Sequence, residues 1–235
     1  MRWSERLFSL RVDAPMPAFE AGQFAKLALE IYGERIARPY SFVNPPGRGP
    51  LEFYYAIVPQ GPLSPRLARL VAGEEIFLAP NPAGFLVLSE VPPAEDLWLI
   101  STGTGIGPFL SIARTGVPWQ RYARVVLVHA VREAAELVYR DVLSQIARER
   151  GAGFVYVPVV SRVPAAGMLQ GRIPGLLLDG SLEKRAGLAV CAERSQVMLC
   201  GNPGMVKDVT ATLLERGLKK HRRRNPGQIT VENYW

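Results

Sequence analysis

Three glycines alternate with other residues in STGTGIGPF, residues 101–109, directly after an apolar run at residues 97–100. A glycine lets the backbone approach a ligand closely because it carries no Cβ atom. The spacing departs from the dinucleotide fingerprint G-x-G-x-x-G, since Gly107 comes one position early and Pro108 holds the place of the third glycine. We therefore expect either a ligand against this backbone or a tight turn between a strand and a helix.

Arginines follow two further apolar segments in the same half of the chain. Arg132 follows VVLVHAV, Arg162 follows FVYVPVVS, and Arg172 lies ten residues beyond Arg162. Planar guanidinium groups suit a phosphate monoester. The three side chains could form a phosphate pocket, or each could be an ordinary surface residue of an arginine-rich chain.

The first half of the chain carries a second group of candidates, Arg38, Tyr40 and Ser41. An arginine, an aromatic ring and a hydroxyl at this spacing could hold a phosphate, stack on a flat ring and hydrogen-bond the edge of that ring. The alternative is a surface arginine beside a core tyrosine.

The segment GPLSP at residues 61–65 predicts a short helix over residues 64–71. Ser64 suits the N-cap and Pro65 the first helical position. The free N–H groups of a helix N-terminus attract anions, so a phosphate held between Arg38 and this turn would explain both features. An ordinary capped helix would explain the turn alone.

Two hydrophobic patterns divide the chain near residue 92. Before it, short segments with alternating apolar and polar residues predict strands at residues 6–12, 26–31, 38–43, 51–58, 74–79 and 84–88. Six short strands with little helix favour a closed antiparallel barrel, because closure removes exposed strand edges.

After residue 92, apolar strands alternate with helices. Strands are predicted at residues 97–101, 124–131, 154–161, 197–201 and 228–235, and helices from 107 and at 134–150, 173–178 and 204–216. Such alternation is typical of a parallel sheet covered on both faces, which binds ligands beyond the carboxyl ends of its strands. The expected fold has two domains: an antiparallel β-barrel over residues 1–92 and an α/β, Rossmann-like parallel sheet over residues 93–235.

The amino-acid composition favours a globular protein and argues against a membrane protein or a metal-binding protein. The chain has 235 residues, 48% hydrophobic and 21% charged, as in ordinary globular proteins. No apolar stretch approaches the ~20 residues that span a bilayer, and the start is broken by charges, so we expect a cytoplasmic protein without a membrane partner. Cys191 and Cys200 form no metal-binding motif, and we expect no metal site. The net charge of +7 indicates an anionic ligand or partner.

Together these segments resemble the ferredoxin–NADP reductase family, most closely its small bacterial members. RPYS at 38–41 matches the flavin motif R-x-Y-S, TGTGIGPF at 102–109 is similar to the nicotinamide-loop motif G-T-G-x-A-P-F, and CGNP at 200–203 matches C-G-x-x. The chain also ends in the family's Tyr-Trp pair. The match covers nearly the whole chain in order. It departs at Gly107, where alanine is commoner, and in a short N-terminus that could leave the barrel edge incomplete.

The resemblance implies FAD in the barrel, with Arg38 on its phosphates, Tyr40 stacked on its isoalloxazine or ribityl side and Ser41 near N5. The remaining implied FAD contacts are the strand residues Tyr55, Ala56 and Ile57, the pyrophosphate-binding residues Pro62, Leu63 and Ser64, and the tail residues Tyr234 and Trp235.

The resemblance also implies NADP(H) on the parallel sheet. Its implied contacts are the loop residues Gly103, Thr104 and Gly105, the residues Arg132, Ser161, Arg162 and Arg172, of which the arginines select the 2′-phosphate, and Cys200, Gly201 and Asn202. Thr104 would touch both cofactors and Cys200 would pack on the nicotinamide. The implied catalytic residues are Ser41, Cys200, Glu232 and Tyr234.

The activity implied is hydride transfer between NADPH and FAD and single-electron exchange with an acidic ferredoxin or flavodoxin, by a monomer. The basic run at residues 219–224 is expected to steer that carrier to the flavin edge. Two alternatives stay open: an NADH-using reductase component of an oxygenase system, and a non-catalytic flavin-binding redox sensor. A nucleic-acid binder working through residues 219–224 lacks a supporting motif.

Overall fold

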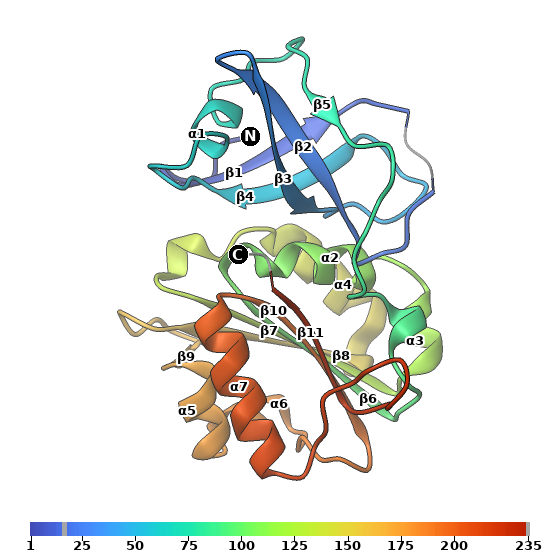
Figure 1. The fold of residues 1–235 in the computed structure, drawn as a ribbon. Coiled ribbons are helices and arrows are strands. Elements are labelled where there is room, and N and C mark those ends of the chain that lie inside the picture. The colour runs from blue at the N-terminus through green and yellow to red at the C-terminus, as the bar shows by residue number, and fades with distance from the viewer. Residues whose placement is uncertain (16–17, 234–235) are drawn as a thin grey trace.

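The computed structural model describes residues 1–15 and 18–233, which form an antiparallel part and a parallel-sheet part (Figure 1). The elements of the antiparallel part are β1 (Leu7–Val12), β2 (Phe24–Ile31), β3 (Glu34–Ser41), β4 (Leu51–Ala56), α1 (Ser64–Leu67) and β5 (Phe77–Leu78). One sheet pairs β1 with β4, and a second has the order β3-β2-β5. Antiparallel sheets are what the alternating pattern predicts.

The two antiparallel sheets meet at one end of β3 and β4. An isolated bridge joins Phe42 to Phe53 just past the end of β3. Within residues 1–15 and 18–233, this is the one bridge between these two segments, so β3 and β4 diverge away from it. The barrel is therefore open between β3 and β4.

Three predicted elements of this part are wrong in extent or type. Residues 84–88 are not a strand, although Leu86 and Val87 are buried, because the apolar run is irregular backbone that packs into the core. The predicted strand at 74–79 shrinks to β5. The helix expected over 64–71 ends at Leu67, its N-cap is Leu63, and the Ser64 hydroxyl accepts a hydrogen bond from the Val58 N–H instead of capping the helix.

The parallel part contains six strands in the order β11-β10-β6-β7-β8-β9, and every pair is parallel. The strands are β6 (Asp96–Thr102), β7 (Arg124–Val131), β8 (Phe154–Val160), β9 (Leu169–Gln170), β10 (Ser195–Gly201) and β11 (Ile229–Asn233). The helices are α2 (Ile106–Ala113), α3 (Val117–Arg121), α4 (Arg140–Arg150), α5 (Ile173–Leu178), α6 (Ser181–Ala186) and α7 (Pro203–Glu215). None of the helices in the described chain is long and apolar enough to cross a membrane.

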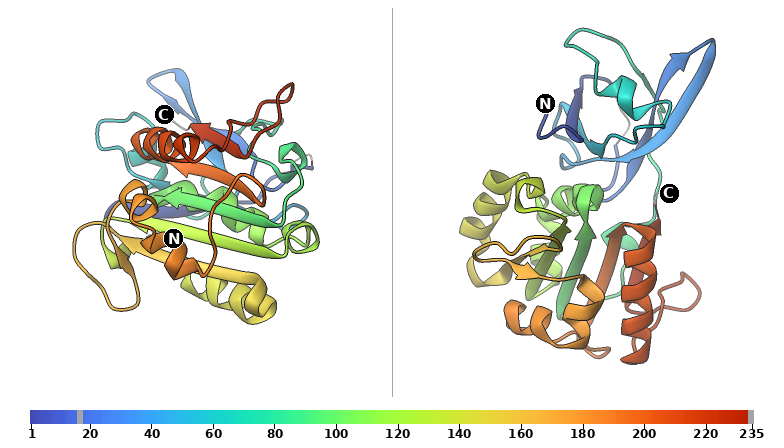
Figure 2. Two further views of the ribbon diagram at one scale, coloured as in Figure 1. Left: turned by 90° about the horizontal axis from the view of Figure 1, so that it is seen from below. Right: turned by 90° about the vertical axis from the view of Figure 1, so that its left-hand side faces the viewer.

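The two-sided burial of the sheet explains its apolar strands (Figure 2). In β6, Leu97 and Leu99 join a core cluster with residues of α2 and α4. Trp98 and Ile100 point the other way, into a cluster with residues of α5, α6 and α7. Successive side chains of a strand point to opposite faces, so a strand covered on both faces must be apolar throughout. This confirms the predicted parallel sheet, whereas β9, α3 and α6 were not predicted.

Helix α2 lies between the sheet and the antiparallel part, and all eight of its residues are buried. Its Ser111 hydroxyl donates to the Asn44 carbonyl at 2.8 Å, and Arg114 donates to the Val43 carbonyl at 3.3 Å. The cluster on this face also contains Leu7 and Tyr54 of the antiparallel part. One core therefore joins the two halves.

A chain of hydrogen bonds centred on Tyr139 adds a polar link between the halves. The Tyr139 hydroxyl donates to the Glu52 carboxylate at 3.0 Å and lies 2.6 Å from the Ser9 hydroxyl. Trp3 Nε1 donates to the Ser9 oxygen at 2.6 Å. Because the Tyr139 hydrogen goes to Glu52, Ser9 must donate to Tyr139. Each member thus has its donor or acceptor satisfied by the next.

Replacing Tyr139 with phenylalanine tests the strength of this link. The change removes the hydroxyl that serves both Ser9 and the nearly buried Glu52 carboxylate, so we expect Tyr139→Phe to lower the free energy of unfolding by roughly 1–3 kcal/mol, measured by urea denaturation. Tyr122 is the matched control, because it is also buried and its hydroxyl has no hydrogen-bond partner among the described residues. Equal losses in Tyr139→Phe and Tyr122→Phe would contradict a specific role for the link.

Candidate functional site

The glycine loop after β6 is a short 3₁₀ turn, Gly103–Gly105, that leads directly into α2. Gly103 has φ +53°, and a Cβ atom there would meet nothing within 4 Å. A Cβ on Gly105 would lie 2.5 Å from the Cys200 carbonyl oxygen. On Gly107 it would make an ordinary 3.6 Å contact with Val43. Only Gly103 therefore offers open backbone to a ligand, whereas Gly105 is required by the neighbouring strand.

A second glycine, Gly201 at the end of β10, is packed against Thr102, the last residue of β6 before the first turn. Gly201 has φ +139°, and a Cβ there would lie 2.2 Å from the Thr102 hydroxyl oxygen. That oxygen accepts a hydrogen bond from the Asn202 N–H at 2.8 Å. The Asn202 side-chain oxygen accepts from the Gly204 N–H at 2.9 Å and so caps α7. The predicted nucleotide-binding turns are in contact, but the Asn202 oxygen is already engaged in capping.

The predicted catalytic residues come from three strands. Cys200 is buried in β10, in register with Ser101 of β6 and Glu232 of β11. The Glu232 carboxylate reaches the antiparallel part, since its Oε1 lies 2.8 Å from where a Cβ on Gly84 would be. Ser41 is the last residue of β3. Tyr234 and Trp235 lie outside the described residues.

His129 is a residue of this site that the sequence analysis missed. It is fully buried in β7, opposite Ser101, and its Nε2 lies 3.1 Å from the Gly103 carbonyl oxygen. Because a carbonyl can only accept, Nε2 carries the hydrogen and donates it. Burial lowers the pKa of His129 to about 4, so the ring is neutral near pH 7 and holds the turn through its one N–H. The sequence feature that could have indicated this residue is a single histidine within the otherwise apolar segment VVLVHAV.

The predicted FAD residues lie around the opening between β3 and β4. The rings of Tyr40 and Tyr55 meet edge to face at 5.6 Å, and Leu63 belongs to the same cluster. Burial raises the pKa of Tyr40 to about 12, so its hydroxyl remains protonated. The exposed Arg38 guanidinium donates to the Ala37 carbonyl at 2.7 Å. An aromatic ring and an exposed cation beside an open strand edge fit a flat ring that carries phosphates.

The other predicted FAD contacts vary in exposure. Ala56 and Ile57 are half-buried at the end of β4, Pro62 is exposed, and Leu63 and Ser64 are buried. Because the Ser64 side chain is turned inward to Val58, a phosphate at this turn would have to meet backbone N–H groups rather than the Ser64 hydroxyl.

The three arginines predicted to select the 2′-phosphate, and the predicted NADP(H) contact Ser161, lie beyond the carboxyl ends of β7, β8 and β9. Hydrogen bonds from Ser161 N–H to the Val131 carbonyl and from Arg162 N–H to the Arg132 carbonyl, each 3.0 Å, continue the β7–β8 pairing past the sheet. In the next pair of strands, Val160 of β8 pairs with Gln170 of β9, and Arg172 follows two residues after Gln170. Arginines and a serine gathered at one sheet edge fit a phosphate monoester. Backbone pairing thus places Arg132, Ser161 and Arg162 side by side, and Arg172 lies two residues past the end of β9, whereas their joint binding of a phosphate stays a prediction.

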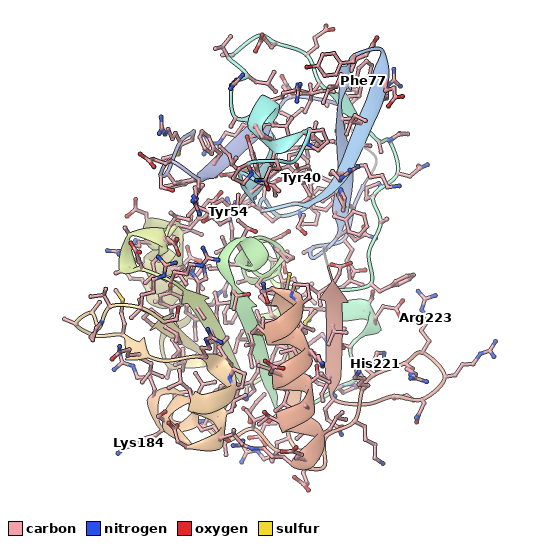
Figure 3. The ribbon with its side chains drawn as sticks, turned by 60° about the vertical axis from the view of Figure 1, so that its left-hand side comes forward. Tyr40, Tyr54, Phe77, Lys184, His221 and Arg223 are labelled. Atoms are coloured by element: carbon pink, nitrogen blue, oxygen red, sulfur yellow. The ribbon has the colours of Figure 1, made fainter. Side chains whose placement is uncertain are left out.

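The basic run at residues 219–224 lies elsewhere. It precedes the amino end of β11, and the His221 N–H bonds to the Ile229 carbonyl there. Arg223 Nε donates to Glu90 at 2.9 Å, and its guanidinium lies 4.5 Å from the Phe85 ring centre. Figure 3 shows His221 and Arg223 well away from Tyr40. The run is at the opposite end of the sheet from the glycine loop, which does not favour a role at the flavin edge.

Comparison with known proteins adds independent findings. Residues 99–211 match the family model of the oxidoreductase NAD-binding domain. A flavodoxin/ferredoxin–NADP reductase of Escherichia coli (strain K12) is 50% identical over 99% of this chain and 94% of its own length. A ferredoxin–NADP reductase of Pseudomonas aeruginosa is 35% identical over 98% of this chain and 92% of its own. The crystal structure of a ferredoxin NADP⁺ reductase from Neisseria gonorrhoeae with bound FAD and NADP superimposes with a TM-score of 0.94, at 36% identity, covering 99% of this chain and 94% of that one.

The depressed pKa of His129 predicts an acid-sensitive fold. In the unfolded chain its pKa is about 6.5, so as the pH falls from about 6.5 towards 4 the unfolded state takes up a proton that the folded state does not. The associated stability is complete above pH 6.5 and is lost through this window, by roughly 3 kcal/mol at about 1.4 kcal/mol per pH unit. His129→Gln keeps a donor without a titrating ring and should lose less stability between pH 7 and 4.5 in urea titrations.

The control for this experiment is the second histidine, His221, which lies outside the sheet core. His221→Gln should retain the full acid sensitivity of the parent protein. If His129→Gln loses as much stability as the parent does, then the acid sensitivity arises from other groups.

Proposed function

This chain belongs to the flavodoxin/ferredoxin–NADP reductase family of FAD- and NADP(H)-dependent oxidoreductases, and from that premise we propose which of its residues carry the reaction. When bound, FAD supplies hydride exchange with NADPH and single-electron exchange with ferredoxin or flavodoxin. One observation carries the assignment: the glycine turn at the start of α2 contacts β4 of the antiparallel part. This contact supports an arrangement in which the two proposed nucleotide sites adjoin at this turn.

We propose that the opening between β3 and β4 holds FAD. Arg38 supplies positive charge to its phosphates, and Tyr40 packs against its ring system. Because the raised pKa of Tyr40 keeps its hydroxyl protonated, this side chain offers a neutral donor near the flavin. Ser41, at the end of the same strand, supplies a hydroxyl to the flavin side of the predicted site.

On the NADP(H) side we propose that the nicotinamide lies against the open backbone of Gly103, beside Thr104. His129 holds the Gly103 carbonyl and thereby fixes the orientation of the adjoining peptide groups. Gly105 and Gly201 bring the two turns into backbone contact, which keeps Cys200 buried next to the same loop. These residues orient the ligand, while Arg132, Ser161, Arg162 and Arg172 hold its phosphate.

The division proposed is a FAD domain at residues 1–92 and an NADP(H) domain at residues 93–235. The first contains nine basic and nine acidic residues, whereas the second contains nineteen basic and twelve acidic ones, so the whole net charge of +7 belongs to the second. This supports an anionic dinucleotide on the second domain and an acidic carrier protein as partner.

The function is tested with the purified chain. We expect the visible absorption of bound flavin, oxidation of NADPH with ferricyanide as acceptor, and NADPH-dependent reduction of ferredoxin or flavodoxin. A bound flavin without turnover would instead support a redox sensor, and a preference for NADH would support a reductase component of an oxygenase system.

Replacing Arg172 tests the phosphate pocket. Arg172 is exposed next to the end of β9, and a charge-assisted contact to the 2′-phosphate contributes roughly 1.5–3 kcal/mol, less where solvent screens it. Arg172→Ala should weaken NADPH binding about tenfold and leave NADH binding nearly unchanged, measured by titration of the flavoprotein. Arg148→Ala, an exposed site on α4, is the control for lost charge. Equal weakening of both dinucleotides would contradict the assignment.

A further inference from the structure

Glu133 lies directly beside one of the proposed phosphate-binding arginines. It follows Arg132 past the end of β7, and its Oε1 accepts a hydrogen bond from Arg162 Nη1 at 3.0 Å. The backbone bond between Arg162 and Arg132 holds the two segments next to each other. The Glu133 carboxylate therefore lies next to the Arg162 guanidinium at this sheet edge.

The carboxylate opposes the proposed ligand electrically. The Glu133 and Arg162 side chains are 54% and 58% exposed, so both can be reached from solvent. A 2′-phosphate on Arg162 would place its charge within a few ångströms of the Glu133 carboxylate, and like charges at that distance repel even in water. The 2′-phosphate would also have to share the Arg162 guanidinium with Glu133, which already accepts a hydrogen bond from it. A dinucleotide without the 2′-phosphate meets neither obstacle.

A carboxylate at this position also has a partner in NADH. In dinucleotide-binding α/β folds, an acidic side chain beyond the Gly-rich turn hydrogen-bonds the ribose 2′-hydroxyl, whereas an arginine accommodates the 2′-phosphate. In this chain both kinds of side chain stand at one sheet edge and are paired with each other. Each dinucleotide thus finds one favourable group here.

We propose that Glu133 is a specificity-determining residue that weakens the preference of this protein for NADPH over NADH. The proposal rests on the proposed function, in which Arg162 binds the 2′-phosphate. By competing for Arg162, Glu133 lowers NADPH affinity, and by its charge it makes binding of the 2′-phosphate sensitive to salt.

The test is Glu133→Gln, which preserves an oxygen acceptor for Arg162 and removes the charge. Titration of the flavin-loaded protein with NADP⁺ should show binding about threefold to tenfold tighter than in the parent, while NAD⁺ affinity stays within twofold or falls. The gain should shrink at 1 M salt, where the Debye length is about 3 Å. Glu149→Gln is the matched control: the same charge is lost from α4, where Glu149 bonds to Gln145, and both affinities should remain at parent values.

Two outcomes overturn the proposal: unchanged or weaker NADP⁺ binding in Glu133→Gln, and equal tightening of NADP⁺ and NAD⁺. Arg162→Ala separates this failure from failure of the proposed function. If Arg162→Ala weakens NADP⁺ while Glu133→Gln has no effect, the role of Glu133 is wrong and the phosphate pocket stands. If Arg162→Ala leaves NADP⁺ binding unchanged, the assignment of Arg162 fails, and the role of Glu133 fails with it.

Discussion

The burial of helix α2 on every side is the constraint on which the rest of the structure depends. A surface helix needs one apolar stripe, but α2 faces the parallel sheet on one side and the antiparallel part on the other, so IGPFLSIA contains no charged residue. Its polar exception, Ser111, donates across to the Asn44 carbonyl. Because packed interiors tolerate little displacement, the helix fixes both the glycine turn at its start and the separation of the two halves.

The glycine turn is shaped more by its protein neighbours than by a ligand. Gly105 and Gly201 are both required because a Cβ would collide with the Cys200 backbone in the first case and with the Thr102 hydroxyl and backbone in the second. Gly103, in contrast, borders open space. Its carbonyl accepts a hydrogen bond from the neutral ring of the buried His129. The hydrogen bond that fixes the Gly103 carbonyl is therefore made by a fully buried side chain for which no ligand contact is predicted.

Local pattern in the sequence predicts the elements better than the contacts between them. The mainly apolar strands β6, β7, β8 and β10 were predicted, because burial on both faces of a sheet leaves a distinctive composition. The strand predicted at residues 84–88 was wrong. Leu86 and Val87 are buried, which gives the segment an apolar pattern like that of a strand, but its backbone forms no strand ladder. The Glu133–Arg162 pair and the Tyr139–Glu52 hydrogen bond join residues far apart in the chain. Neither contact could be predicted, because the sequence around one residue does not indicate its distant partner.

The core that contains both Leu7 and Leu97 has a consequence for how this protein could be recombined. The change from antiparallel to parallel sheets falls near residue 92, but residues from both sides of it share one hydrophobic core. Exchanging one half for that of a relative would require the contact around α2, Val43 and Tyr54 to be transplanted with it. The two halves thus differ in topology, but a variant that exchanges one of them must preserve the packing of both.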